Sequence, residues 1–298
     1  MEHVSVLNEE YQRNAWDEMK NTINNKISEI SLDNIQHVAK KLFLTNIYRG
    51  RGVLIKTVIE AQENCVQSTP VYATLFASVN MVFPIIGDLL LRRLIRRYQQ
   101  GQQKNSLELK SPPAIFISFL LHQHVADECL VRQILIDLLT NPTNGSIQLA
   151  VSILLICSTK LDTKHREILL AILLEYRMSH QFDKQTNCMV DGFLATRDIY
   201  NQVGSKKVDE IGKKFQVIHA FELFHHLDPE NYLDEFVYDS NYKVTENHYS
   251  ERIKIIFDRK IYIIAIDTFI GVQYEETCSP TQTIRIPIVR KIIYAAMK

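Results

Sequence analysis

Residues 128–158, ECLVRQILIDLLTNPTNGSIQLAVSILLICS, hold the pattern that decides the fold. Leucine, isoleucine and valine recur at three- and four-residue intervals on both sides of Pro142 and Gly145, two residues that interrupt helices. The pattern therefore predicts two helices, over residues 128–140 and 146–158, with a short turn between them. Helices joined by so short a connection pack as an antiparallel pair.

The same helical periodicity extends over about residues 8–258 and is interrupted by breakers such as Pro84, Gly101 and Pro112–Pro113. Two helices with their turns take roughly 40 residues, the period of HEAT-type repeats. We therefore predict an all-α protein, a HEAT-like α-solenoid of antiparallel helix pairs with an irregular C-terminal tail. A compact irregular helical bundle is the alternative. Further helices are predicted at residues 53–62, 71–80, 85–100, 114–123, 165–180, 183–200 and 246–257.

The composition is that of an ordinary globular chain. The sequence has 298 residues, of which 46% are hydrophobic, and 34 basic residues balance 34 acidic ones. A net charge of zero gives no global argument for nucleic-acid binding. The five cysteines are widely spaced and odd in number, which indicates reduced thiols rather than a disulfide framework. The apolar runs are shorter than the ~20 residues of a membrane-spanning helix, so we expect no membrane partner.

The character of the sequence changes after Asp258. Residues 260–276 are rich in isoleucine, tyrosine, valine and threonine, a composition that favours a strand. We therefore divide the chain into a flexible N-terminus at residues 1–8, a helical domain at 9–258 and an irregular tail at 259–298.

The sequence contains none of the common catalytic motifs, so we expect no enzyme, no catalytic residues, no cofactor and no metal site. His122 and His124 are two residues apart, which directs them to different faces of a helix. His225 and His226, followed by Asp228, provide too few converging ligands for a metal ion.

Two groups of arginines are candidate contacts for RNA phosphate or for an acidic partner. Four of them lie in one predicted helix at i, i+4 spacing, where two rows would share a solvent-facing strip; two more lie in a loop. A solvated helix face beside a leucine stripe explains the helical group equally well. The candidates are Arg92, Arg93, Arg96 and Arg97 in the helix, and Arg49 and Arg51 in the loop.

Several separated motifs together resemble one protein family. They are the Tyr-Gln-Arg-x-x-Trp stretch of Tyr11, Gln12, Arg13 and Trp16, the Arg-Gly-Arg-Gly motif at residues 49–52, the Phe-Pro-x-Ile-Gly step at 83–87 and the Asp-Ser-Asn-Tyr step at 239–242. Over about residues 9–258 the chain resembles the middle domain of initiation factor 4G (the MIF4G domain, HEAT type) in the Cwc-twenty-two pre-mRNA-splicing factors. Residues 284–298 resemble only the start of the MA-three domain that follows in that family, which makes 259–298 a linker and a remnant.

The resemblance implies a non-enzymatic nuclear scaffold for pre-mRNA splicing. In that family the domain binds the DEAD-box helicase initiation factor 4A-III, holds it open and inactive, and delivers it to the spliceosome for assembly of the exon-junction complex. The helicase and spliceosome components are thus the expected partners. A direct RNA-binding module and a translation or decay scaffold of the same fold are the alternatives.

The resemblance also places the helicase contact near the end of the first helix. The family sequence Gly-Leu-Ile-Asn-Lys aligns with residues 22–26, so Thr22, Asn25 and Lys26 are the expected contact residues. Asn25 and Lys26 are retained, whereas Thr22 replaces a glycine and Asn24 replaces an apolar residue. Because a β-branched side chain obstructs close approach, we expect weaker helicase binding than a glycine-containing relative shows. Trp16 is expected to be a packed anchor of the helix rather than a contact.

Overall fold

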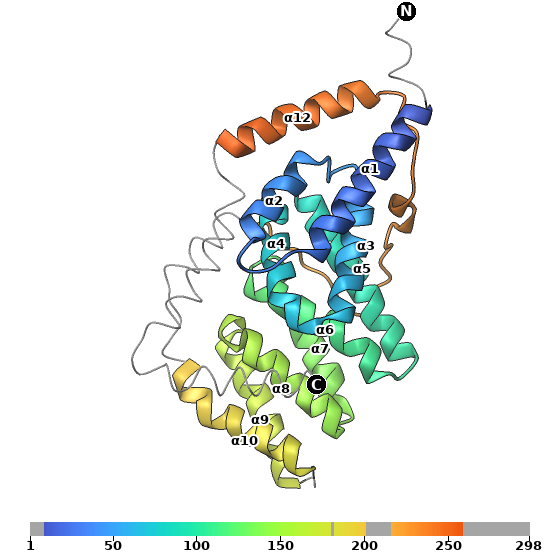
Figure 1. Cartoon of the computed structure of the whole chain (residues 1–298). Helices are drawn as coiled ribbons and strands as arrows, with labels where there is room; N and C mark the ends of the chain where they lie inside the picture. Colours follow the sequence, from blue (N-terminus) through green and yellow to red (C-terminus); the bar gives the residue numbers. More distant parts are fainter. Residues whose placement is uncertain (1–8, 180–181, 201–215, 259–298) are drawn as a thin grey trace, which may run out of the picture. The chain divides into compact units, whose positions relative to one another are not determined.

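The computed structural model describes residues 9–179, 182–200 and 216–258 (Figure 1). The predicted flexible N-terminus, the predicted strand at 260–276 and the remnant up to residue 298 lie outside these residues. Within the described ranges every regular element is helical. The predicted all-α class of HEAT-like helix pairs is therefore confirmed.

The chain divides into two compact units. The first contains residues 9–92 together with 228–258, and the second contains residues 93–227. The long helix α5 (Pro84–Gln103) contributes its first part to one unit and its second part to the other.

The first unit begins with helices that pack on their neighbours in sequence. Helix α1 packs on α2 and α3, and α2 and α3 each pack on α4 (Figure 1). Nearly all of α4 is buried, which its apolar composition requires. The bounds are α1 Glu9–Ser28, α2 Ile35–Leu44, α3 Arg51–Asn64, η2 Val66–Ser68 and α4 Thr69–Val82.

The same unit is completed by a segment from much later in the chain, with the short helix η4 (Asn231–Asp234) and helix α12 (Tyr242–Asp258). The hydroxyl of Tyr249 lies 2.9 Å from the carbonyl oxygens of both Phe43 and Thr45, at the end of α2. Arg252 donates to the carbonyl oxygen of Val82, the last residue of α4, at 2.8 Å. Helix α12 thus satisfies carbonyl groups that α2 and α4 leave open at their C-terminal ends.

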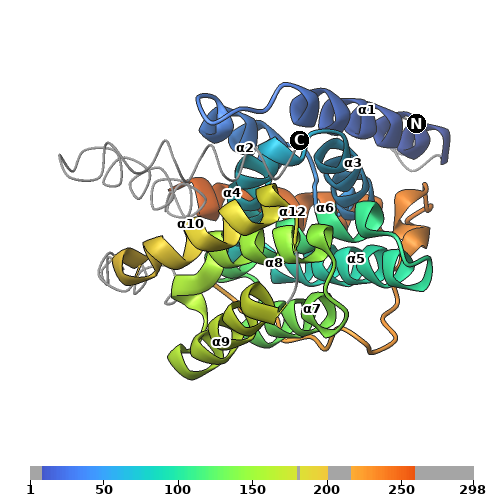
Figure 2. The ribbon, with the colours of Figure 1, turned by 90° about the horizontal axis from the view of Figure 1, so that it is seen from below.

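The second unit continues the pattern of packed helix pairs. Helix α6 packs on α7 and α8, α7 also packs on α9, and α8 packs on α10 (Figure 2). The helix predicted at 128–140 is confirmed with the same bounds. The bounds are α6 Leu107–His122, α7 Glu128–Thr140, α8 Asn144–Cys157, η3 Ser158–Lys160, α9 Thr163–Ser179 and α10 Lys184–Tyr200.

One predicted boundary is wrong. Pro112 and Pro113 do not separate two helices but lie inside α6, which begins at Leu107. Proline leaves the carbonyl group four residues earlier without its helical partner. Here those carbonyls belong to Glu108 and Leu109, both exposed residues, so water can replace the missing bonds.

An extended segment, residues 216–227, completes the second unit. His219 pairs with the backbone on either side of Ala126, because its N–H donates to the carbonyl of Val125 and its carbonyl accepts from the N–H of Asp127. The buried amide of Gln99 donates to the carbonyl oxygens of Leu223 and His225, at 2.7 and 2.9 Å. Its backbone is thus held by hydrogen bonds to the connection between α6 and α7 and to the side chain of Gln99 on α5.

Candidate partner-binding site

The expected helicase-contact residues lie together on one face of α1, because Thr22, Asn25 and Lys26 follow i, i+3, i+4 spacing. Asn25 is exposed, while Thr22 and Lys26 are half-buried. The Thr22 hydroxyl donates to the carbonyl of Glu18 at 2.9 Å, and the Lys26 ammonium pairs with the carboxylate of Glu29. The face therefore presents an amide that can donate and accept, next to one positive charge. We call it the α1 face below.

The side of α1 next to this face packs on α3. Met19, Ile23 and Ile27 are buried there, and α1 passes very close to the backbone at Gly50. A Cβ atom at Gly50 would lie 2.9 Å from the Met19 sulfur and 3.0 Å from Cδ1 of Ile23. The absence of a side chain at Gly50 thus sets how deeply α1 sits.

Asn24 lies beyond the buried side of α1, away from Thr22 and Lys26, and is bound to α3. Its Oδ1 accepts a hydrogen bond from the Thr57 hydroxyl at 2.7 Å, and both residues are half-buried. Sequence reasoning treated Asn24 only as a departure from the family's contact patch. The structure gives its side chain a partner within the chain.

The Tyr-Gln-Arg-x-x-Trp motif binds the segment of residues 236–242. The buried side chain of Gln12 donates from Nε2 to the carbonyl of Asp239 at 2.9 Å and accepts at Oε1 from the Asp239 N–H at 3.0 Å. The guanidinium of Arg13 lies 4.6 Å from the centroid of the Phe236 ring. Trp16 meets Phe236 edge to face at 6.4 Å, and it is buried, as expected of an anchor.

The Arg-Gly-Arg-Gly motif, at the start of α3, also binds this late segment of the chain. Arg49 donates to the carbonyl of Val237 at 3.3 Å, and its guanidinium lies 4.4 Å from the centroid of the Tyr242 ring. A Cβ atom at Gly52 would lie 2.2 Å from the carbonyl oxygen of Leu233, so only glycine permits this approach of η4. Two motifs that are far from residue 239 in sequence thus form one docking site for residues 231–242.

The two arginines predicted in a loop are engaged within the chain, and Arg51 is in fact the first residue of α3. Besides its contacts to residues 237 and 242, Arg49 lies 3.4 Å from Oε1 of Gln12. Arg51 donates to the carbonyl of Tyr48 at 2.8 Å and lies 5.2 Å from the centroid of the Tyr48 ring. An RNA contact at either residue would compete with these bonds.

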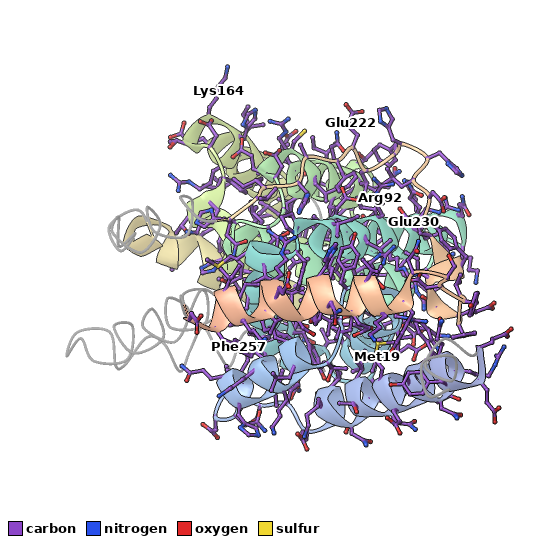
Figure 3. All side chains as sticks on the ribbon, turned by 90° about the horizontal axis from the view of Figure 1, so that it is seen from above. Met19, Arg92, Lys164, Glu222, Glu230 and Phe257 are labelled. Carbon is purple, nitrogen blue, oxygen red and sulfur yellow. The ribbon has the colours of Figure 1, made fainter. Side chains whose placement is uncertain are left out.

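The predicted solvent-facing strip on α5 needs correction. Arg93 is only 6% exposed, because it lies three residues after Leu90 and shares the buried face of the helix. Arg92 is half-buried and is bound to Asp88 at 2.6 Å, with Glu230 at 4.0 Å (Figure 3). Arg96 donates to Gln99, and Arg97 is exposed.

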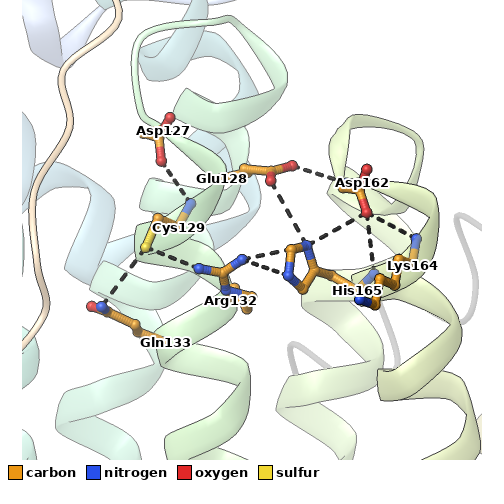
Figure 4. A network of polar contacts seen from close by, with 8 residues as sticks. All are labelled: Asp127, Glu128, Cys129, Arg132, Gln133, Asp162, Lys164 and His165. Atoms are coloured by element: carbon orange, nitrogen blue, oxygen red, sulfur yellow. Dashed lines mark hydrogen bonds and ion pairs between the residues drawn. The ribbon is translucent and has the colours of Figure 1, made fainter.

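A polar network joins the N-terminal ends of α7 and α9 (Figure 4). Asp127 caps α7 by accepting from the N–H of Cys129, and Glu128 accepts from the N–H of Asp162. The guanidinium of Arg132 lies between two partners. One of its nitrogens is 3.3 Å from the Cys129 sulfur, and the other is 2.8 Å from Nε2 of His165. Because each polar group here serves a helix cap or a neighbour, we interpret the network as structural.

The described ranges hold no metal cluster, no disulfide and no membrane-spanning helix. No three His, Cys, Asp or Glu side chains among these residues are grouped closely enough to hold a metal ion. The cysteines described by the structure, Cys65, Cys129, Cys157 and Cys188, are free thiols. No helix in the described part of the chain is long and apolar enough to span a membrane.

Comparison with known proteins identifies the family. No family model matches the chain. The chain is 33% identical over 254 residues to "Pre-mRNA-splicing factor CWC22 homolog" of Mus musculus, a match that covers 83% of this chain. It is 32% identical over 248 residues to "Pre-mRNA-splicing factor cwc22" of Aspergillus fumigatus, which covers 81% of this chain.

A third relative, "Pre-mRNA-splicing factor cwf22" of Schizosaccharomyces pombe, is 32% identical over 252 residues and covers 83% of this chain. In each of these matches the chain spans 28% of the relative's own length. Similarity of this extent covers most of the chain and is found in relatives from fungi and a mammal. It confirms the family that the sequence motifs predicted. The chain belongs to the Cwc22 family of pre-mRNA-splicing factors.

Proposed function

We propose that this chain is a non-enzymatic scaffold of pre-mRNA splicing that acts in the nucleus with spliceosome components. Its direct partner is the DEAD-box helicase initiation factor 4A-III, which it holds open and inactive and delivers for assembly of the exon-junction complex. The observation that carries this proposal is the similarity to pre-mRNA-splicing factors over 81–83% of the chain.

The α1 face supports a protein partner of mixed polar character. The exposed amide of Asn25 offers donor and acceptor groups at once, and Lys26 offers an ammonium group that is paired with Glu29 in the free chain. A complementary surface would supply a carboxylate and backbone groups. Thr22, half-buried in the turn before Asn25, limits how closely such a surface can approach.

Inhibition of a helicase needs no catalytic residue in the scaffold. A DEAD-box helicase alternates between open and closed arrangements of its two lobes, and a partner shifts this equilibrium only if it binds one arrangement more tightly. If the chain bound the open arrangement about a hundredfold more tightly, the free energy of lobe closure would become less favourable by about 2.7 kcal/mol. We therefore expect binding and loss of RNA-stimulated ATPase activity to occur together.

The test is a titration of the purified chain against initiation factor 4A-III, followed by measurement of the helicase's RNA-stimulated ATPase activity. Asn25→Asp with Lys26→Glu reverses the character of the α1 face and should abolish both effects. Asn247→Asp with Lys254→Glu makes the same change in charge at exposed positions of α12 and should leave both intact.

Three outcomes would contradict the proposal in different ways. A folded chain that does not bind at tens of micromolar would show that the helicase is not its partner. RNA binding that falls steeply with salt and is lost on reversal of Arg96 and Arg97 would favour the RNA-binding alternative. Binding without loss of ATPase activity would retain the partner but remove the inhibitory role.

A further inference from the structure

The hydrogen bond between Asn24 and Thr57 lies on the side of α1 that is turned away from Thr22 and Lys26. Asn24 precedes Asn25 directly, and successive side chains leave an α-helix about 100° apart. A rotation of α1 that displaced Asn24 from Thr57 would therefore turn Asn25 and Lys26 by the same angle. Thr57 Oγ1 and Asn24 Oδ1 are 2.7 Å apart. Keeping this hydrogen bond therefore fixes the direction in which the α1 face points.

The apolar contacts beneath this part of α1 do not set that direction by themselves. Met19 and Ile23 pack against Gly50 at the start of α3, and Ile27 is also buried. Apolar burial has no preferred orientation, and the methionine side chain adapts to different neighbours. A hydrogen bond, by contrast, weakens steeply outside a narrow range of distance and angle.

Directional contacts fix α1 at two points along its length. Near its N-terminal end Gln12 is bound to the backbone of Asp239 by two hydrogen bonds. Asn24 follows twelve residues later, which at 1.5 Å per residue is about 18 Å along the helix axis. A helix held at two such points can neither roll nor slide without breaking a bond.

We propose that Asn24 and Thr57 are positioning residues, which orient the α1 face toward the protein partner without touching it. The identity of the partner rests on the proposed function above, whereas the orientation of α1 is a property of the free chain. The two can therefore be tested separately on the same proteins.

Three variants of the full chain distinguish positioning from simple stabilisation. Thr57→Val removes the hydroxyl at nearly constant shape, and Thr57→Ser retains it. Asn24→Leu with Thr57→Val replaces both partners by apolar groups, a change that leaves stability nearly unaltered. For each variant we would measure the affinity for initiation factor 4A-III, hydrogen exchange of the amides of residues 22–28, and the melting temperature.

We expect Thr57→Val to weaken helicase binding about three- to tenfold, the range of one hydrogen bond, and to accelerate exchange at residues 22–28 but not at 12–16. Thr57→Ser should behave as the unaltered chain. The double variant should regain the melting temperature but not the affinity, since its apolar pair restores packing without direction.

Two results would overturn the inference. One is unchanged exchange at residues 22–28 in Thr57→Val, and the other is full recovery of affinity in the double variant. Should the unaltered chain fail to bind the helicase, the proposed function would fall, and the exchange measurement alone would still decide whether the pair positions α1.

Discussion

Gln12 and Asp239, 227 residues apart in the sequence, exchange a reciprocal pair of hydrogen bonds between one side-chain amide and one backbone unit. Gln12 is fully buried, so water cannot replace either bond. The contact ties the first helix to the segment that leads into α12. The N-terminal helices and the end of the described chain thus depend on each other within the first unit.

Gln12→Ala should lower the free energy of unfolding by about 2–4 kcal/mol, because it removes the contact with Arg49 and both hydrogen bonds to Asp239, whose N–H and C=O then lack their partner. Denaturation in urea measures the change. Asn14→Ala, at an exposed position of the same helix, is the control and should alter stability by less than about 0.5 kcal/mol. A loss in Gln12→Ala no larger than in Asn14→Ala would contradict the importance of the contact.

The two glycines of the Arg-Gly-Arg-Gly motif should respond differently to alanine. At Gly52 the new methyl group would lie 2.2 Å from the carbonyl oxygen of Leu233, and η4 would have to move away. At Gly50 it would meet the ends of the Met19 and Ile23 side chains, which can shift. We expect a loss of about 3 kcal/mol or more for Gly52→Ala and about 1–2 kcal/mol for Gly50→Ala.

Urea denaturation of both glycine variants, together with near-ultraviolet circular dichroism of Trp16, provides the measurement. Trp16 is the single tryptophan of the chain and contacts Phe236, so its signal reports whether residues 231–242 remain docked. Equal losses in the two variants, with an unaltered tryptophan signal, would mean that η4 is not held by the approach to Gly52.

Helical periodicity predicted most of the fold correctly. The helix at 128–140 was predicted with its exact bounds because its apolar residues are regularly spaced and Pro142 follows it. Pro112 and Pro113 gave a wrong boundary, since the sequence does not reveal that the preceding turn of α6 is exposed to water. The local sequence pattern therefore predicts where helices form, but not whether the first turns of a helix can accommodate proline.

Long-range docking was not predictable in the same way. Residues 231–242 have no helical or strand period, and their positions depend on side chains more than 180 residues earlier. The paired glycines at 50 and 52, next to the start of a helix, were the one local signal of a close backbone approach. Likewise, the partner of Asn24 lies on another helix, so the sequence placed Asn24 near the α1 face without assigning it a role.

Asp137 should be essential to the second unit. Its carboxylate accepts from the Tyr98 hydroxyl at 2.6 Å and from Gln102 at 2.9 Å, and it pairs with Lys110 at 3.2 Å. Burial and the neighbouring carboxylate raise the pKa of Tyr98 above its usual range, so the phenol remains a donor. Asp137→Ala leaves a mostly buried ammonium unpaired and should cost about 3–5 kcal/mol in unfolding free energy.

The matched control for Asp137 is Asp191→Ala, which breaks the exposed pair between Asp191 and Arg177 in the same unit. Exposed ion pairs contribute little to stability, so this variant should melt close to the unaltered chain. Similar melting temperatures for the two variants would show that the cluster around Asp137 is no more important than a surface pair.

The stability of the second unit should depend on pH through His122. Burial, with the nearby charges of Lys160 and His124, lowers the pKa of His122 from 6.5 to about 3. Between these values the unfolded chain binds a proton that the folded chain does not, so stability is complete above pH 6.5 and decreases as the pH falls. The loss from this one group approaches about 1.4 kcal/mol per pH unit.

Unfolding in urea at pH 7, 6 and 5 tests this dependence before most carboxylates begin to titrate. His122→Gln removes the group and should flatten the curve relative to the unaltered chain, because the difference between the two proteins isolates His122 from the other histidines. Parallel curves for the two proteins would mean that His122 takes up its proton equally well in the folded and unfolded states, and that its burial does not disfavour the charged imidazole.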